Sequence, residues 1–265
     1  MKKYFISIPI LFFAIFSYCQ NSEYFEAVYD IYYNTDLPQV RKAKLEVDKT
    51  NKHSIFHIYK NKDTDTDTSV SSDEDGVSYT IQYTDLDRFI EMKFEESTIF
   101  SKETHRGKVY FVKDSILTLN WKLDYDDEKK IGSLICKKAT THFRGRDYTA
   151  WYTLEIPLPY GPYKFHGLPG LIVSISDSSN TFSWTIASYK LRAEKPKFEF
   201  NDKLEPLITA KKYYSEIRYP ADNEREKIIQ SKLPQGIKLV SVTSDAHIRK
   251  GVEIKFEWEE EKKED

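Results

Sequence analysis

The sequence predicts a mainly β protein, built as a large twisted antiparallel sheet or half-barrel with one or two short helices near the C-terminus. Aromatic residues make up 15% of the chain and tyrosine alone occurs 19 times, which favours strands over helices. Short runs of alternating apolar and polar residues recur between turn-forming residues, as is typical of consecutive antiparallel strands. Helical patterns occur only late in the chain.

The alternating runs define a series of expected strands. Short polar turns connect several of them into hairpins, including KTNK after residue 48, RGR after residue 143 and SSN after residue 177. The expected strands are residues 24–34, 42–48, 53–59, 77–83, 88–94, 108–114, 117–124, 134–143, 147–153, 171–177, 181–191, 237–243 and 251–259. We expect the last two to form a closing hairpin.

Two helices are expected after these strands. Thr209 can cap a helix over 210–218, and Asp222, after Pro220, can cap one over 223–233. We find no repeat and no linker between domains. We therefore expect one β-rich domain over residues 20–260 and a charged tail at 261–265.

The first nineteen residues resemble a signal peptide. A basic start is followed by an apolar stretch over 4–16, too short to span a bilayer, which needs about 20 apolar residues. Ser17 and Cys19 are small residues at alternate positions, so we expect cleavage after Cys19 and a mature chain that begins at Gln20. The alternative is a lipid anchor on Cys19, which Tyr18 disfavours. Both predict export, to the periplasm or to the cell surface.

Charge and cysteine content exclude some function classes. Removing residues 1–19 takes two lysines from the 40 basic residues, so 38 remain against 42 acidic ones. This balance gives no reason to expect nucleic acid as a partner, since that requires a clustered basic face. No later apolar run reaches membrane-spanning length, so we expect no transmembrane segment after signal removal. Cys136 is then the one thiol, and no intramolecular disulfide can form.

The segment GPYKFHGLPGLIVSISD (161–177) concentrates the residues that restrict or free the backbone. Four of the ten prolines and three of the nine glycines lie between residues 157 and 170. Pro169 and Gly170 suit the centre of a type II turn, with positive φ at Gly170. We favour a rigid corner that packs Phe165 and Leu168 into the core. The alternative is a ligand-binding rim that presents Lys164, Phe165 and His166.

Within this segment, the run Gly167, Leu168, Pro169, Gly170, Leu171, Ile172 resembles the hallmark of the GLPGLI family. The likeness extends upstream through Cys136, Ala139, the FRGR turn and Ala150-Trp151-Tyr152. The resemblance implies an exported envelope protein of Gram-negative bacteria. The family has no established activity, catalytic residue or ligand, so the resemblance implies location and fold and carries over no mechanism.

Two patterns resemble metal sites without meeting their requirements. Acidic residues in 61–76 are spaced as in a calcium loop, but Thr68 stands where that loop needs glycine. We expect a solvated acidic loop there. His53 and His57 are four residues apart, and on a strand that spacing separates them by about 13 Å. We therefore expect no metal and no cofactor.

Candidate reactive and binding residues lie close to the family motif. Cys136 follows two apolar residues, and His142 would lie about 20 Å along the same strand, so we expect an inert, buried thiol. No catalytic sequence motif is present. Arg144, Arg146 and Trp151 allow two interpretations: a solvated turn beside a core tryptophan, or an anion or glycan site with planar donors and a stacking ring.

These observations predict an exported, non-catalytic binding protein. Its partner would be an envelope or outer-membrane protein, or an apolar or lipidic ligand held against a curved sheet. The alternatives are a secreted hydrolase with an unrecognised active site and a structural or assembly factor of the envelope. A catalytic site should show convergent polar groups with perturbed pKa values, whereas a binding site should show an apolar cleft with few of them.

Overall fold

The structure is a computed structural model. It describes residues 23–35, 38–59, 70–73, 76–79, 88–196, 206–221, 227, 230–231 and 249–259. Several expected features lie outside the described residues. They are the signal peptide with Cys19 and Gln20, the acidic residues 61–69, the strand 237–243 and nearly all of the helix 223–233.

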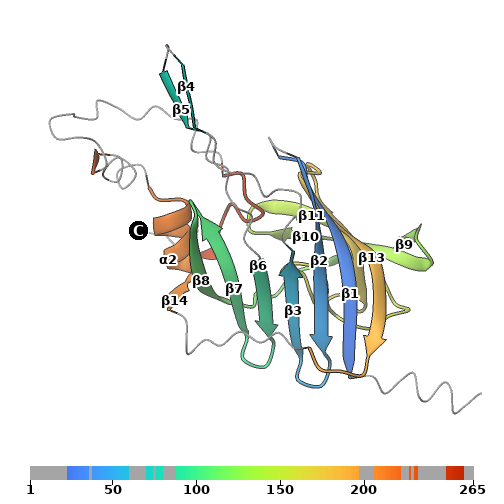
Figure 1. The fold of residues 1–265 in the computed structure, drawn as a ribbon. Coiled ribbons are helices and arrows are strands. Elements are labelled where there is room, and N and C mark those ends of the chain that lie inside the picture. The colour runs from blue at the N-terminus through green and yellow to red at the C-terminus, as the bar shows by residue number, and fades with distance from the viewer. Residues whose placement is uncertain are drawn as a thin grey trace, which may run out of the picture.

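One large open sheet dominates the fold (Figure 1). Its twelve strands follow the order β14-β8-β7-β6-β3-β2-β1-β13-β12-β11-β10-β9, and β4 and β5 pair separately. Neighbouring strands are antiparallel except β14, which runs parallel to β8. The strands are β1 Tyr24–Tyr33, β2 Gln39–Asp48, β3 His53–Ile58, β4 Val70–Asp73, β5 Gly76–Tyr79, β6 Arg88–Lys93, β7 Thr98–His105, β8 Lys108–Ser115, β9 Lys122–Ile131, β10 Leu134–Phe143, β11 Arg146–Thr153, β12 Leu171–Asp177, β13 Phe182–Arg192 and β14 Leu207–Thr209.

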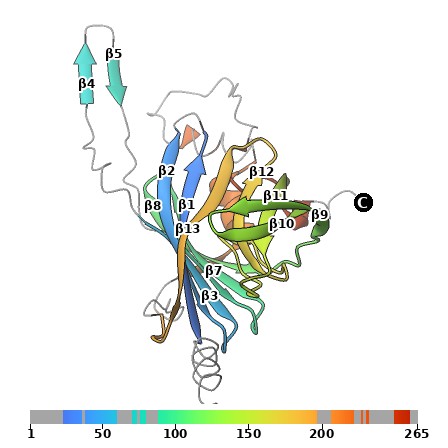
Figure 2. The same ribbon diagram turned by 90° about the vertical axis from the view of Figure 1, so that its right-hand side faces the viewer.

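The sheet curls strongly without closing. Figure 2 shows β9, β10 and β11 turned across the direction of β1, β2 and β3. Register shifts interrupt the pairing at Val28/Tyr29 in β1, at Lys137/Lys138 in β10 and at Trp151/Tyr152 in β11. Such bulges bend a strand and increase its local twist. The expected curved antiparallel sheet is therefore confirmed, with one parallel pair at its edge.

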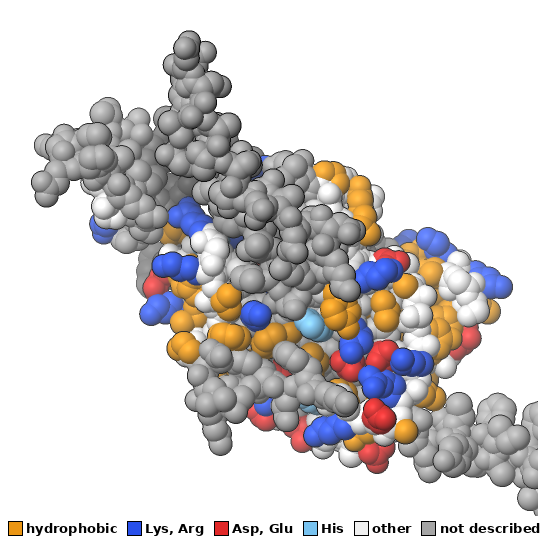
Figure 3. Space-filling model, viewed as in Figure 1, with side chains coloured by type: hydrophobic (Ala, Val, Ile, Leu, Met, Phe, Trp, Pro, Cys, Tyr) orange, Lys and Arg blue, Asp and Glu red, His pale blue; other side chains and the backbone are white. Residues whose placement is uncertain are grey.

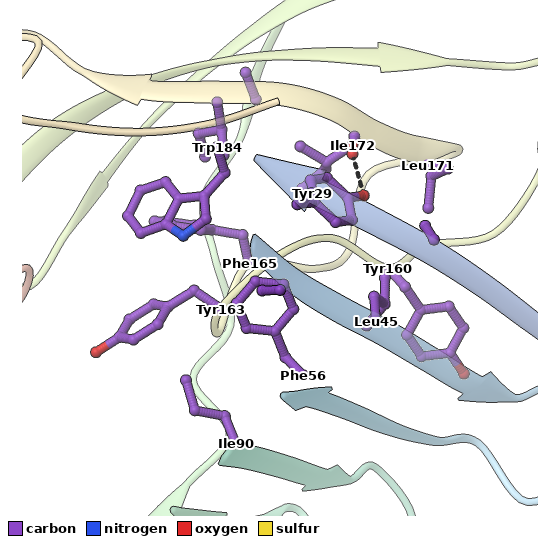
Figure 4. Close-up of a cluster of buried hydrophobic side chains, with 14 of the residues drawn as sticks. Tyr29, Leu45, Phe56, Ile90, Tyr160, Tyr163, Phe165, Leu171, Ile172 and Trp184 are labelled. Carbon is purple, nitrogen blue, oxygen red and sulfur yellow. Dashed lines mark hydrogen bonds between the residues drawn. The ribbon is translucent and has the colours of Figure 1, made fainter. Parts of the chain in front are cut away.

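The main core lies inside this curve (Figure 4). Inward-facing side chains of β1, β2, β3 and β6 meet aromatic residues from the segment between β11 and β12. Tyr29 on β1 donates a hydrogen bond of 2.6 Å to the carbonyl oxygen of Ile172. Phe165 and Trp184 are almost completely buried, with ring centroids 5.8 Å apart. The segment between β11 and β12 thus fills the concave side of the sheet.

Most expected strands are confirmed, and several expectations are wrong. Strands β4, β7 and β14 were not expected from the sequence. β7 completes a hairpin with β6, and β4 pairs with β5 where a solvated loop was expected over 61–76. The expected strand 117–124 begins only at Lys122, because Leu117, Leu119 and Trp121 pack against the core as irregular chain. Residues 251–259 form no strand. They end in the short 3-10 helix η3 (Glu257–Glu259).

The expected helix after Thr209 is confirmed in an unusual form. The hydroxyl of Thr209 accepts a hydrogen bond of 3.2 Å from the backbone N–H of Lys212, which begins α2 (Ala210–Lys212). The chain continues as a π-helix, η2 (Tyr213–Arg218). π-Helical turns are rare and often occur at functional sites.

Candidate functional site

The glycine- and proline-rich segment forms a buried corner, as favoured from the sequence. Phe165 and Leu168 are each 1% exposed. The expected positive φ at Gly170 is wrong: Gly167 adopts it, at 88°. Gly170 is needed for a different reason. A Cβ atom there would lie 1.9 Å from the carbonyl oxygen of Thr153, so the two backbones can approach only with glycine.

Two of the three residues of the alternative, a ligand-binding rim, are buried. Lys164 is 3% exposed, and Phe165 lies in the core. His166 is half-buried. Its ring packs edge-on against Phe94, and its backbone carbonyl accepts a hydrogen bond of 2.8 Å from the indole N–H of Trp121. These contacts hold the corner rigid and turn the lysine inward.

Arg144 is not part of a solvated turn either. The RGR turn between β10 and β11 places Arg144 at φ 42° and Gly145 at φ 88°, as a tight hairpin requires. The backbone N–H groups of Ile254 and Lys255 donate to the carbonyl of Arg144, at 2.9 and 3.1 Å. This packing of the C-terminal segment covers the turn and buries the Arg144 side chain.

Arg144 and Lys164 meet in a buried group of four charges, which we call the charge cluster: Asp114, Arg144, Lys164 and Glu253. The guanidinium of Arg144 makes two hydrogen bonds to the Asp114 carboxylate, at 2.6 and 3.0 Å, and one to Glu253 at 2.7 Å. The Lys164 ammonium lies 2.9 Å from Asp114 and 2.7 Å from Glu253. Each cation therefore contacts both carboxylates.

The pairing fixes all four groups in their charged forms. Burial opposes ionisation of Asp114, but Lys164 and Arg144 outweigh it and hold the pKa of this carboxyl well below its usual range. The pKa of Glu253 is lowered in the same way, with burial again overcome by the two cations. Burial alone would lower the pKa of Lys164, yet Glu253 and Asp114 raise it. None of these groups can exchange protons readily near neutral pH.

Tyr163 joins the charge cluster to a cavity. Its hydroxyl donates a hydrogen bond of 2.6 Å to Glu253, and its ring stacks on Trp184 with centroids 5.9 Å apart. Figure 4 shows the hydroxyl directed away from the other labelled side chains. Tyr163 has φ 58°, a conformation that is rare for a bulky residue and persists only where surrounding contacts stabilise it.

Beyond Tyr163 lies a cavity of about 210 Å³, which we call the tyrosine cavity. Its walls come from η2, the ends of several strands and the C-terminal segment. Aromatic rings and charged side chains contribute to the walls in similar number. The lining residues are Tyr33, Thr35, Ile58, Arg88, Glu103, Thr104, Tyr163, Phe182, Tyr213, Tyr214, Arg218, Tyr219, Lys250, Gly251, Val252 and Glu253.

The two remaining predicted binding residues lie apart from the charge cluster. Arg146 pairs with Asp177 at 2.9 Å and donates to the carbonyl of Gly251 at 3.0 Å. Trp151 packs in a separate apolar cluster with Cys136, under the ammonium of Lys129. The structure therefore does not bring Trp151 together with the two arginines.

The buried thiol expected at Cys136 is confirmed. Cys136 is fully buried, and burial raises the pKa of its thiol to about 11, whereas His142 is exposed and contacts Asp147. His53 and His57 lie on strand β3. Among the described residues, no group of three histidine, cysteine or acidic side chains could hold a metal ion.

The surface and the helices of the described part add two observations. Among the described residues on the face drawn in Figure 3, basic and acidic side chains are interspersed and do not gather into a patch of one sign. No described helix is long and apolar enough to cross a membrane.

A family model described as a protein of unknown function (Porph_ging) matches residues 144–174. The match begins at Arg144 and includes Tyr163, Lys164 and the corner. It therefore covers the residues that form one side of the charge cluster, while Asp114 and Glu253 lie outside it. No curated protein matches the sequence.

Several solved structures are similar to parts of this chain. PNGF-II, crystallised in space group P21, is 14% identical with a TM-score of 0.47, over 72% of this chain and 32% of its own. This chain thus spans about a third of PNGF-II. An uncharacterised conserved protein from Thermus thermophilus is 7% identical with a TM-score of 0.39, over 75% and 99%. A LolA superfamily protein from Nitrosomonas europaea is 10% identical with a TM-score of 0.27, over 70% and 91%.

Proposed function

We propose that the protein is an exported, non-catalytic binding protein that holds its ligand in the tyrosine cavity. The observation that carries the proposal is the cavity itself, a concave space in which aromatic rings and charged side chains converge. Small-molecule sites are concave and combine apolar and aromatic walls with polar groups that orient the ligand. The charge cluster and the close backbone approach at Gly170 make one wall of the cavity rigid. A rigid wall lowers the entropic cost of binding.

The pKa values argue against a hydrolase. A general acid or base works best when its pKa lies near the working pH. In the charge cluster, pairing moves the pKa values of Asp114 and Glu253 down and that of Lys164 up, away from neutrality. Cys136 is buried and outside the cavity. The polar groups that converge here are therefore fixed charges that position other residues.

We also propose, from the sequence, that the chain belongs to the GLPGLI family and is exported after cleavage behind Cys19. The mature protein would then comprise a single domain over residues 20–260 with a short charged tail. Intact-mass analysis of the secreted protein tests this. A first residue of Gln20 is expected, and a diacylglycerol-modified Cys19 would contradict it.

Binding of an apolar or lipidic ligand against the curved sheet is a less favoured form of the same function, because side chains of the core already fill that space. Phe165, Leu168 and their neighbours occupy the concave side in the described part of the chain. An envelope protein partner, as expected for an assembly factor, would instead need an outer surface. The mass of the molecule that co-purifies with the protein distinguishes a lipidic ligand or a protein partner from a small ligand.

The decisive experiment is native mass spectrometry of the protein purified from envelope extracts. Thr104→Trp places a large side chain at the cavity wall, and Thr140→Trp makes the same change on β10, away from the cavity. We expect a bound small molecule in the wild type and in Thr140→Trp and its loss in Thr104→Trp. Retention of one ligand by all three proteins would contradict the cavity as the binding site, and an empty wild type would contradict the function.

A further inference from the structure

The tyrosine cavity contains a cation that no described carboxylate neutralises. Arg88 pairs with Glu103 across β6 and β7, and Glu253 forms ion pairs with Arg144 and Lys164. Arg218, at the end of η2, has only uncharged neighbours among the described residues. These are the ring nitrogen of His105 at 3.1 Å and the ring of Tyr219, whose centroid lies 5.7 Å from the guanidinium carbon.

His105 cannot supply the missing negative charge. Burial and the nearby Arg218 and Arg106 lower the pKa of His105 to about 4, so its ring is neutral at pH 7 and accepts a hydrogen bond from Arg218. One nitrogen of the guanidinium is used in this contact. The planar fork of arginine is suited to a carboxylate, which it can bind through two parallel hydrogen bonds.

The remaining walls indicate the body of the ligand. Tyr213 and Tyr214 pack edge-to-face with centroids 5.0 Å apart, and Tyr214 stacks on Tyr219. The hydroxyls of Tyr213 and Tyr214 make no hydrogen bond to the part of the chain that the structure describes. The ring edges that line the cavity favour an apolar body, and the two hydroxyls can hydrogen-bond to polar atoms on it.

Cavity size limits the ligand further. About 210 Å³ is smaller than the roughly 300–1,000 Å³ of pockets that hold drug-sized molecules. A lipid chain exceeds this space, and an inorganic anion would leave the aromatic walls without contacts. A compact molecule with one anionic group and a ring or branched apolar body matches both the charge and the volume.

From these contacts we propose that the tyrosine cavity binds a small organic carboxylate, with its carboxylate on Arg218 and its apolar body against the tyrosine-lined wall. The inference rests on the proposed function of this same cavity. It narrows the ligand from any small molecule to a carboxylate of about one ring in size.

The test is isothermal titration of the full mature chain with phenylacetate, 4-hydroxybenzoate and 4-methylpentanoate. Benzyl alcohol serves as the uncharged probe and inorganic phosphate as the anion without an apolar body. Arg218→Gln removes the proposed anchor, and Arg218→Lys keeps its charge. Lys212→Gln is the matched control, since it removes one positive charge from the same helical segment outside the cavity. Melting temperatures confirm that each variant is folded.

We expect at least one of the three carboxylates to bind the wild type and Lys212→Gln equally. Arg218→Gln should lose roughly 10- to 100-fold in affinity, with part restored in Arg218→Lys. No binding by any of the carboxylates, equal binding of benzyl alcohol, or phosphate binding with the same dependence on Arg218 would overturn the inference. The proposed function is judged separately: an uncharged molecule retained from extracts and lost only in Thr104→Trp would support the function while overturning the carboxylate.

Discussion

At the scale of single residues, backbone conformations that are rare for large side chains converge on one carboxylate. Arg144 and Tyr163 both have positive φ, and both side chains reach Glu253, at 2.7 and 2.6 Å. Each such conformation costs of order 1–3 kcal/mol and persists only where surrounding contacts stabilise it. Here the stabilising contacts are buried ion pairs and aromatic stacking, so the strain and the charge cluster depend on each other.

The close backbone approach at Gly170 predicts a large effect of a single methyl group. Gly170→Ala would place its Cβ 1.9 Å from the Thr153 carbonyl oxygen, which belongs to β11 and cannot rotate away. We expect a loss of at least about 1–3 kcal/mol in the free energy of unfolding. Urea unfolding measures it.

Two controls separate this clash from backbone strain. Gly132→Ala meets no atom within 4 Å but has φ 59°, so it should cost about 1–2 kcal/mol. Pro169 is exposed, and Pro169→Ala should cost only about 0.4–1 kcal/mol. A Gly170→Ala variant as stable as Pro169→Ala would refute the close approach.

The burial of Lys164 between two carboxylates predicts a second residue-scale effect. Lys164→Met leaves Asp114 and Glu253 with one cation between them in a buried site. Removing one partner of a buried ion pair typically costs about 3–5 kcal/mol. Lys42→Met is the control, because Lys42 and its partner Asp30 are exposed and such pairs contribute about 0–1 kcal/mol. Equal thermal stability of the two variants would contradict a stabilising charge cluster.

At the scale of elements, the short helical segment α2–η2 determines where the cavity residues lie. Tyr213, Tyr214 and Arg218 all project from η2, and the segment starts at the Thr209 cap. Thr209→Ala should lower the free energy of unfolding by about 1 kcal/mol because the Lys212 N–H loses its acceptor, and Thr209→Ser should restore most of it. Chemical denaturation of the three proteins checks this. If the alanine variant is as stable as the wild type, the cap contributes nothing.

Elements with a strong local pattern could be predicted from the sequence, and those that depend on distant contacts could not. Alternation identified most of the sheet, and the FRGR hairpin followed from its turn residues. The run 251–259 alternates as a strand does, yet it packs on the Arg144 turn and joins no sheet. Of the charge cluster, only Arg144 and Lys164 were singled out. No local signal marks Asp114 or Glu253, because their partners are 30 to 109 residues away in sequence.

At the scale of the whole molecule, an open sheet of twelve strands has two edges to protect. β14 is only three residues long, and a short edge offers few unpaired backbone groups. β9 is ten residues long and largely exposed, but most of its side chains are charged. Charged side chains on an edge strand oppose pairing with another chain. The sheet can therefore remain open, and its inner face is free to enclose the corner and the charge cluster.

The charge cluster should also make the stability of the whole molecule depend on pH. The folded-state pKa values of Asp114 and Glu253 are lowered, below unfolded values of about 3.9 and 4.3. Their contribution is complete above about pH 5 and is lost as the pH falls through the folded pKa values. Lys164 has a raised pKa, so its contribution is lost only at alkaline pH, as the pH rises above about 10.4.

Glu253→Gln tests this dependence, with Glu128→Gln as the control because Glu128 is an exposed partner of Lys137. At pH 7 we expect Glu253→Gln to be the less stable of the two in urea. Between pH 6 and pH 3 the wild type should lose stability more steeply than Glu253→Gln, by up to about 1.4 kcal/mol per pH unit for the one carboxyl removed. The two curves should converge in acid, where Glu253 becomes protonated. Parallel curves over this range would mean that Glu253 has an ordinary pKa in the folded protein and that the charge cluster is not held in its ionised form.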